Sequence, residues 1–240
     1  MLLRALADIL FPPLCHACRS FIPDAGTLHL CEACLAEAQP VEPPFCTICG
    51  EQFCTEEGLN HPCGPCLTAP RPFAAARAAA RFGGAVEEMI HRYKYGKKVQ
   101  LRRPLGLLTA VRLAAFAGEC APDLLVPVPL HTKRLRERGF NQALLLARVL
   151  EREWRVPLAR AGMARVRWTE PQVRLSAAER ERNVRGAFAV TDPAAVAGKR
   201  VMLVDDVFTT GSTVNECARV LRRAGADAVF VVTVARAMPL

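Results

Sequence analysis

The sequence predicts an α/β protein built on a parallel sheet, with a small zinc-ribbon module of the four-cysteine type at its N-terminal end. Four Cys-x-x-Cys pairs lie before residue 67, and strand-like segments alternate with helix-like ones beyond residue 72. In addition, a hydroxyl-rich turn joins one apolar strand to the helix that follows it. Alternating strands and helices are typical of a parallel sheet with helices on its faces. A chain of 240 residues can form one sizeable core plus the module.

The Pro-Arg-Pro sequence at 70–72 divides the chain into two predicted domains, residues 1–70 and 71–240. The first holds two basic and eight acidic side chains, whereas the second holds the remaining 30 of 32 basic and 15 of 23 acidic ones. A phosphate-bearing partner is therefore expected at the second domain. We find no membrane span, because no apolar run approaches about 18 residues. Residues 1–14 have helical apolar spacing, so we expect an amphipathic helix rather than a signal peptide, and a cytoplasmic protein.

Eight cysteines of the N-terminal segment form four Cys-x-x-Cys pairs, with 12 residues between the first two pairs and 13 between the last two. The pairs are Cys15 and Cys18, Cys31 and Cys34, Cys46 and Cys49, and Cys63 and Cys66. Two such pairs complete a tetrahedral structural zinc site. We therefore expect a double zinc ribbon with two zinc ions and sequential pairing, while crosswise pairing and iron–sulfur ligation stay chemically open. Disulfides would need an oxidising compartment, and a redox dithiol needs only one pair.

The three remaining cysteines have less specific surroundings. Cys54 lies near His61 in the sequence, and either could replace a zinc ligand, but we favour an unpaired thiol and a loop histidine. Cys120 and Cys217 stand alone in apolar segments, which is typical of cysteines that fill a core.

In the second domain, hydrophobic periodicity predicts the order of the elements. We expect strands at 123–130, 200–204 and 228–235, and helices at 139–152, from 176 onward and at 212–224. Ser176 and Glu179 have the spacing of a capping box. The alanine-rich segment 73–82 has the propensity of a helix but is also compatible with an edge strand, and the sequence does not decide between the two.

The segment 201–213 carries the most specific signal. Its apolar strand ends in Asp205 and Asp206, and a small polar turn leads into the next helix. The turn and the start of that helix comprise Thr209, Thr210, Gly211, Ser212 and Thr213. Free amides at a helix start, together with hydroxyls and a glycine that permits close approach, suit a phosphate group. Because carboxylates would repel the phosphate, we expect them to face neutral hydroxyls; two solvated aspartates beside a chance helix cap are the alternative.

This segment resembles the phosphoribosyl-pyrophosphate motif of the type I phosphoribosyltransferases, in which two acids hold the ribose hydroxyls and the turn holds the 5-phosphate. The chain as a whole resembles the ComF family of competence-associated proteins, in which paired Cys-x-x-Cys motifs precede such a domain. The matching positions are Tyr93 to Gly96, Val126 to Leu130, His131 to Gln142, Gln172, Arg180, Asn183 and Gly186 to Phe188.

The resemblance implies a site for phosphoribosyl pyrophosphate and magnesium. Asp205 and Asp206 would bind the ribose and stabilise the positive charge that develops on it. The pyrophosphate loop would comprise Leu130, His131, Thr132, Lys133 and Arg134. A mobile hood would include Gln172, Arg180 and Asn183. Magnesium would bridge the pyrophosphate and the ribose hydroxyls. Lys94, at the end of a predicted helix, is expected only to complement the helix dipole.

Three functions are open at this point. The first is a transferase whose acceptor the sequence does not reveal, and the second is a non-catalytic sensor of phosphoribosyl pyrophosphate or a related sugar phosphate. The third is a zinc protein that binds single-stranded DNA, for which residues 131–185 offer 14 basic side chains against six acidic ones, with Trp154 and Trp168 for base stacking. The paired aspartates favour the first two. The resemblance to the ComF family implies a role in natural transformation with a DNA-translocating helicase as partner.

Overall fold

The structure is a computed structural model that describes residues 12–23, 26, 28–55, 57–169 and 176–238. Most of the predicted helix within residues 1–14 lies outside the described residues, and so does Gln172. Within the described part of the chain, no helix combines the length and the apolar character that a membrane span requires.

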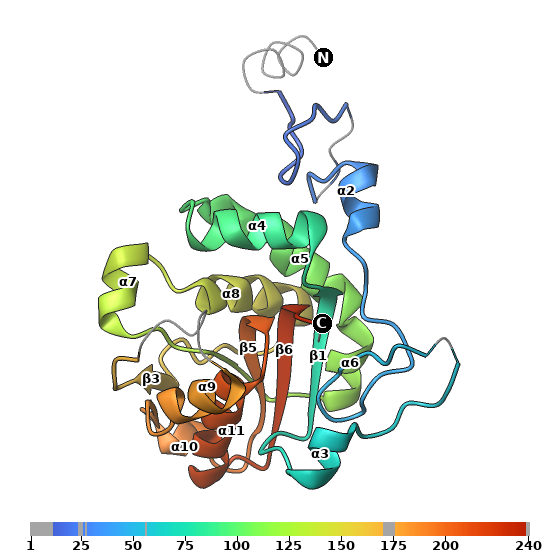
Figure 1. Ribbon diagram of the computed structural model, residues 1–240. Coiled ribbons are helices and arrows are strands. Elements are labelled where there is room, and N and C mark those ends of the chain that lie inside the picture. The colour runs from blue at the N-terminus through green and yellow to red at the C-terminus, as the bar shows by residue number, and fades with distance from the viewer. Residues whose placement is uncertain (1–11, 24–25, 27, 56, 170–175, 239–240) are drawn as a thin grey trace.

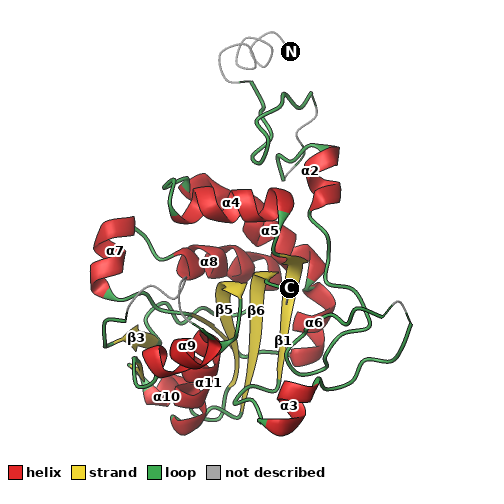
Figure 2. Ribbon diagram, viewed as in Figure 1, coloured by secondary structure: helices red, strands yellow, loops and turns green. Residues whose placement is uncertain are grey.

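Four parallel strands form the central sheet in the order β1-β6-β5-β2 (Figures 1 and 2). Their bounds are Ala75–Arg81 for β1, Leu124–Pro127 for β2, Arg200–Phe208 for β5 and Ala228–Arg236 for β6. A separate antiparallel pair joins β3 (Met163–Arg165) to β4 (Phe188–Val190). The parallel sheet confirms the predicted α/β class.

Helices cover both faces of the sheet (Figure 1). The longer ones are α4 (Gly84–Lys94), α5 (Arg102–Arg112), α6 (Ala114–Cys120), α7 (Thr132–Arg138), α8 (Gln142–Trp154), α9 (Ala177–Val184) and α11 (Ser212–Arg223). Shorter ones are α2 (Glu32–Glu37), α3 (Gly64–Thr68), α10 (Pro193–Val196) and the 3-10 turn Val99–Leu101. Helices α5 and α8 contact each other and one face of the sheet. Helix α11 contacts the other face, and it also contacts α9 and β4.

The two central strands divide the core into two halves because successive side chains of a strand point to opposite faces. Met202 and Val204 of β5 pack with the side chains of α4, α5 and α8. Their neighbours Val201 and Leu203 pack on the opposite side, with the buried face of α11. A sheet that is buried on both faces explains why these strands read as continuous apolar runs.

The strands at 200–208 and 228–236 and the helices at 142–154 and 212–223 lie where the sequence predicts them, with shifted ends. The predicted capping box is present, since Ser176 N donates to Glu179 Oε2 at 2.8 Å and Glu179 N to Ser176 Oγ at 3.4 Å. The undecided segment 73–82 forms strand β1, because pairing with β6 outweighs the helix propensity of alanine.

Two other elements differ from the prediction. The strand at 200–204 continues to Phe208, so Asp205 and Asp206 lie within β5 rather than at its end. The predicted loop at 130–134 is in part a helix: His131 caps α7 by accepting a hydrogen bond from Lys133 N at 3.2 Å. The cap satisfies one amide of the first turn and so stabilises the start of this helix.

Candidate functional site

The eight paired cysteines form two clusters, and in each the four sulfurs lie within 4.8 Å of one another. The first cluster contains Cys15, Cys18, Cys31 and Cys34, and the second contains Cys46, Cys49, Cys63 and Cys66. Consecutive Cys-x-x-Cys pairs, which we call knuckles, therefore combine in sequential order: the first with the second and the third with the fourth. Four thiolates at this spacing fit a closed, tetrahedral zinc site, so the clusters support two structural zinc ions.

The two ribbons repeat the same local structure. In each, the amide of the third cysteine donates to the sulfur of the first. These hydrogen bonds join Cys31 N to Cys15 Sγ at 3.4 Å and Cys63 N to Cys46 Sγ at 3.2 Å. A residue with positive φ follows the second cysteine in both ribbons: Arg19 at 68° and Gly50 at 70°. The repeat allows equivalent positions in the two ribbons to be compared directly.

The ribbons differ in how they meet the rest of the molecule. All four cysteines of the second cluster are buried, whereas Cys18 of the first is exposed. Ala76 N of strand β1 donates to Ile48 O of the second ribbon at 2.7 Å. A Cβ atom added at Gly50 would lie 2.5 Å from Ala76 O, so this ribbon rests directly on the edge of the sheet.

Arginines of helix α4 and strand β1 donate hydrogen bonds to the turn of each ribbon. Arg92 of α4 donates to His16 O at 2.6 Å and to Ala17 O at 3.1 Å in the first ribbon. Arg77 of β1 donates to Thr47 O, at the equivalent turn of the second ribbon, at 3.1 Å.

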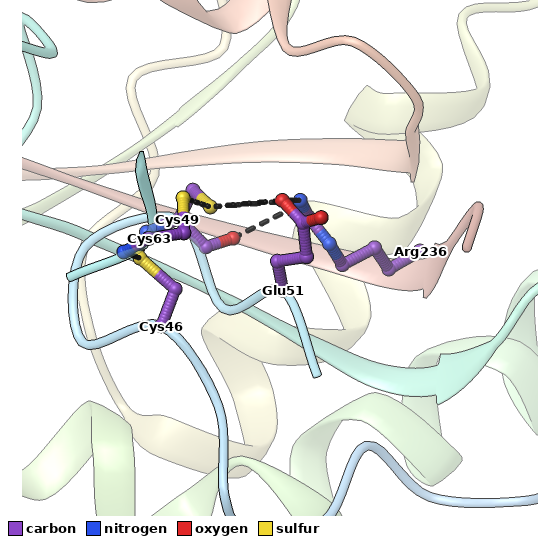
Figure 3. Close-up of polar contacts among 5 residues, drawn as sticks. All are labelled: Cys46, Cys49, Glu51, Cys63 and Arg236. Atoms are coloured by element: carbon purple, nitrogen blue, oxygen red, sulfur yellow. Dashed lines mark hydrogen bonds and ion pairs between the residues drawn. The ribbon is translucent and has the colours of Figure 1, made fainter. Parts of the chain in front are cut away.

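A third arginine reaches the second cluster itself (Figure 3). Arg236, the last residue of β6, donates from Nη1 to Cys49 O at 2.7 Å, and its Nη2 lies 3.4 Å from Glu51 Oε2. Burial raises the pKa of Cys49, and the charge of Arg236 opposes this effect. Burial also raises the pKa of Cys46, but the amides of Cys49, Cys63 and Ile48 outweigh it and bring the pKa to about 6. Amide donors of this kind favour the thiolate that a metal requires.

The other sulfur and imidazole groups take no part in the clusters. Cys54 is an exposed free thiol, and His61 stacks on Phe53 with 4.3 Å between ring centroids. Cys120 and Cys217 are buried among apolar side chains, as predicted for cysteines that fill a core.

A cavity of about 400 Å³ opens beside the end of β5. Of the predicted site residues, it is lined by Leu130, Arg134, Arg180, Asp205, Asp206, Thr209 and Thr213. The carboxylates are 9% and 4% exposed. Burial, and then the neighbouring Asp206, raise the pKa of Asp205 to about 7. Within the described part of the chain, Asp206 Oδ2 is buried and has no hydrogen-bond partner, so this carboxylate can still accept a ligand group.

The hydroxyl-rich turn lies between the acid pair and α11. Thr209 and Thr213 face the cavity, whereas the hydroxyls of Thr210 and Ser212 bond to each other at 2.8 Å. Gly211 has φ of 79°, and a Cβ at this position would lie 2.7 Å from Cζ of the Phe208 ring. Both the backbone conformation and the lack of space therefore require glycine.

Helix α7, the residues Arg165 and Thr169, and Arg180 of α9 border the cavity. His131 and Lys133 do not line it; they contact Trp168, with centroids 5.3 Å apart for the two rings and Lys133 Nζ 4.6 Å from the indole centroid. Thr132 begins α7 and is exposed. Asn183 lies in α9, where its carbonyl accepts a hydrogen bond from Arg167 at 2.8 Å.

Lys94 is the main site residue that sequence reasoning undervalued. It does end helix α4, but its ammonium lies 2.8 Å from Asp206 Oδ1 within the cavity, so complementing the helix dipole is not its only role. Its position in the Tyr-Lys-Tyr-Gly motif was the available signal. Arg138 and Arg165 also line the cavity; Arg138 lies within the segment 131–142 that matches the ComF family, whereas no local pattern distinguished Arg165 from other arginines.

The chain matches two family models, the double zinc ribbon domain over residues 6–67 and the phosphoribosyl transferase domain over residues 136–238. It is 36% identical over 224 residues to the DNA utilization protein YhgH of Escherichia coli, covering 92% of this chain and 95% of the relative. It is 33% identical over 221 residues to competence protein F of Haemophilus influenzae, covering 88% and 94%.

A solved structure described as the allosteric regulatory enzyme of purine biosynthesis is similar over 60% of this chain and 30% of that one, with 23% identity and a TM-score of 0.41. The two sequence relatives are matched over nearly their whole length. In this chain, the match to the zinc ribbon model precedes the match to the transferase domain model. The chain therefore belongs to the ComF family of competence-related, phosphoribosyltransferase-like proteins with an N-terminal double zinc ribbon.

Proposed function

We propose that the protein is a phosphoribosyltransferase of the competence system that binds phosphoribosyl pyrophosphate with magnesium. The observation that carries the proposal is the cavity in which a buried pair of carboxylates lies beside a hydroxyl-rich helix start. Residues 1–70 would form the zinc module and residues 71–240 the transferase domain. The reduced thiols of two zinc clusters are consistent with a cytoplasmic protein.

The 5-phosphate of the ligand would occupy the turn at 209–213. Gly211 allows the phosphate to approach the backbone, and the first amides of α11 have no acceptor within the helix, although Ser212 N makes a long contact of 3.4 Å with Thr210 Oγ1. Thr209 and Thr213 line the cavity next to them. The ribose hydroxyls would reach Asp205 and Asp206, which lie within the preceding strand β5. This arrangement separates the negative phosphate from the carboxylates.

The residues present also fit a divalent cation. Asp206 has one oxygen paired with Lys94 and one buried oxygen without a partner among the described residues, and carboxylate oxygens are the ligands that magnesium prefers. Magnesium, when bound, would neutralise negative charge of the pyrophosphate. Leu130 and Arg134 at the start of α7 would bind the pyrophosphate, with His131, Thr132 and Lys133 completing that segment.

The protein's own contribution to catalysis would be electrostatic. As the anomeric bond breaks, the carboxylates of Asp205 and Asp206 lie where positive charge develops on the sugar, and the cationic side chains lie where negative charge develops on the leaving group. Arg180 borders the cavity and would act in a hood that excludes water, together with Gln172 and Asn183. Binding without turnover would make the same site a sensor.

Helix α7 supports a second candidate, contact with single-stranded DNA. None of its residues is buried, and it carries Lys133, Arg134, Arg136 and Arg138. Such a surface could follow a phosphate backbone, and a DNA-translocating helicase would be the partner that delivers the strand.

The direct test is calorimetric titration of magnesium phosphoribosyl pyrophosphate into the zinc-loaded full chain. We expect saturable binding by the parent, strong weakening in the Asp205→Asn/Asp206→Asn double variant, and no change in a control variant of the exposed Asp227 to Asn. A folded parent that shows no binding would refute the proposal. Fluorescence anisotropy with labelled single-stranded DNA over a range of salt concentrations would then test the second candidate.

A further inference from the structure

Arg236 lies between the second zinc cluster and the turn at 209–213. Its side chain is almost fully buried, although it carries a positive charge. On the ribbon side, its guanidinium contacts three groups: Cys49 O at 2.7 Å, Cys49 Sγ at 3.6 Å and Glu51 Oε2 at 3.4 Å (Figure 3). The carbonyl and sulfur partners belong to one ligand residue of the cluster, so the position of this arginine depends on the shape of the ribbon.

The same guanidinium also contacts the ring of Phe208, the residue that precedes the turn. Its carbon Cζ lies 4.4 Å from the centroid of the Phe208 ring, within the range of a cation–π contact. Arg236 and Phe208 are neighbours in the register of β5 and β6, and Ala237 N donates to Phe208 O at 2.9 Å. These contacts fix the ring relative to the end of β6.

The Phe208 ring in turn supports the glycine of the turn. Because a Cβ at Gly211 would lie 2.7 Å from ring Cζ and 3.0 Å from Cε1, no space separates the ring from the backbone. A shift of the ring would therefore move the backbone that precedes α11. A continuous series of contacts thus leads from Cys49 through Arg236 and Phe208 to the turn.

Charge explains why the metal matters to this series. Four thiolates with one zinc ion carry a net charge of about −2, which adds to the carboxylate of Glu51 in compensating the buried guanidinium. Without the metal, the ribbon loses the bonds that hold Cys49 in place, because zinc binding and ribbon folding are one event. The first ribbon is different: Arg92 donates to its turn carbonyls and not to a cysteine ligand, and helix α4 reaches the cavity through Lys94 at Asp206 rather than at the turn at 209–213.

We propose that Arg236 is a positioning residue that transmits the zinc-bound shape of the second ribbon to the 5-phosphate turn. Affinity for the sugar phosphate then depends on metal in the cluster of Cys46, Cys49, Cys63 and Cys66. The inference rests on the proposed function, since it assigns a phosphate to this turn.

The test compares two ligands that use different parts of the cavity. Ribose 5-phosphate and pyrophosphate are titrated separately into the zinc-loaded full chain, as the parent, as Arg236→Met and as the control Arg92→Met. We expect Arg236→Met to weaken ribose 5-phosphate by about tenfold, the size of one buried cation–π contact, and to leave pyrophosphate unchanged. Arg92→Met should leave the affinity for ribose 5-phosphate as in the parent.

Zinc release to a colorimetric chelator provides a second measurement that does not depend on ligand binding. We expect one of the two zinc ions to leave Arg236→Met faster than it leaves the parent. If Arg236→Met does not fold, Phe208→Leu keeps the ribbon contacts of the arginine and removes the ring between the arginine and the turn, together with the edge contact of that ring with Phe73, so it should weaken ribose 5-phosphate without altering zinc release.

The outcomes separate the two proposals. The role of Arg236 would be overturned if Arg236→Met and Phe208→Leu both bound ribose 5-phosphate as tightly as the parent. An equal loss of affinity for ribose 5-phosphate and for pyrophosphate would overturn it as well. If the parent binds neither ligand, the proposed function fails and this inference fails with it.

Discussion

Replacing Asp205 with asparagine should stabilise the protein, and the gain should grow with pH. Asp205 is buried beside Asp206, and burial followed by that second carboxylate raises its pKa from 3.8 to about 7. Lys94 offers one ammonium for two carboxylates. The asparagine Oδ1 can still accept the hydrogen bond from Asp206 N, which is 2.9 Å in the parent. The substitution thus removes a charge and keeps the contact.

The magnitude follows from the pKa. The difference between 3.8 and about 7 corresponds to roughly 4 kcal/mol at about 1.4 kcal/mol per pH unit, and we expect about half of this after relaxation. A raised carboxyl pKa means that the folded state holds the proton more tightly. The stability contributed by Asp205 therefore falls as pH rises from about 4 to about 7 and is lost above that range. Asp205→Asn should gain about 1 kcal/mol near pH 5.5 and about 2 kcal/mol near pH 8.

Urea unfolding of the zinc-loaded protein at several pH values measures this gain. Asp227→Asn, at an exposed position, serves as the control and should show no trend with pH. An equal gain at both ends of the pH range would show that ionisation of Asp205 is not the cause. A loss of stability near pH 8 would refute the reasoning outright. We expect Asp205→Asn to lose ligand binding as well. A variant that is more stable but does not bind would show that the acid pair serves function at a cost in stability.

Three further substitutions test the ion pair and the repeated ribbons. Lys94→Met leaves the buried Asp206 without its 2.8 Å partner and should lower the free energy of unfolding by about 2–3 kcal/mol in urea; a loss below about 1 kcal/mol would mean that solvent screens the pair. Gly50→Ala should lower the free energy of unfolding by more than about 2 kcal/mol, because residue 50 has φ of 70° and the added Cβ would meet Ala76 O. Arg19→Gly, at the equivalent exposed position, should instead gain about 0.5 kcal/mol in thermal unfolding, and equal effects at both positions would contradict the difference in docking.

Local sequence signals predicted the elements that depend on local chemistry. The Cys-x-x-Cys spacing predicts both clusters because a knuckle is formed within a few residues. The strand, turn and helix at 201–213 were recognisable because the polar turn separates two different hydrophobic periods. The capping box at Ser176 needs only two residues three positions apart.

What the sequence did not predict depends on distant partners. Strand β1 forms against its helix propensity because β6, more than 140 residues further along the chain, supplies its hydrogen bonds. Lys94 and Asp206 meet across the cavity, and Arg236 meets Cys49 across 187 positions of sequence. No periodicity within either segment marks such a pair, since each residue looks ordinary among its neighbours.

The contact between the second ribbon and strand β1 has a consequence for self-association. β1 is an edge strand that consists mainly of alanine, and an unpaired edge is a template on which another chain can add a strand. The hydrogen bond from Ala76 N to Ile48 O and the close approach of Gly50 cover part of this edge. Zinc in the second cluster would therefore also protect the protein against aggregation. Removal of the metal should cause self-association of the protein before the sheet unfolds.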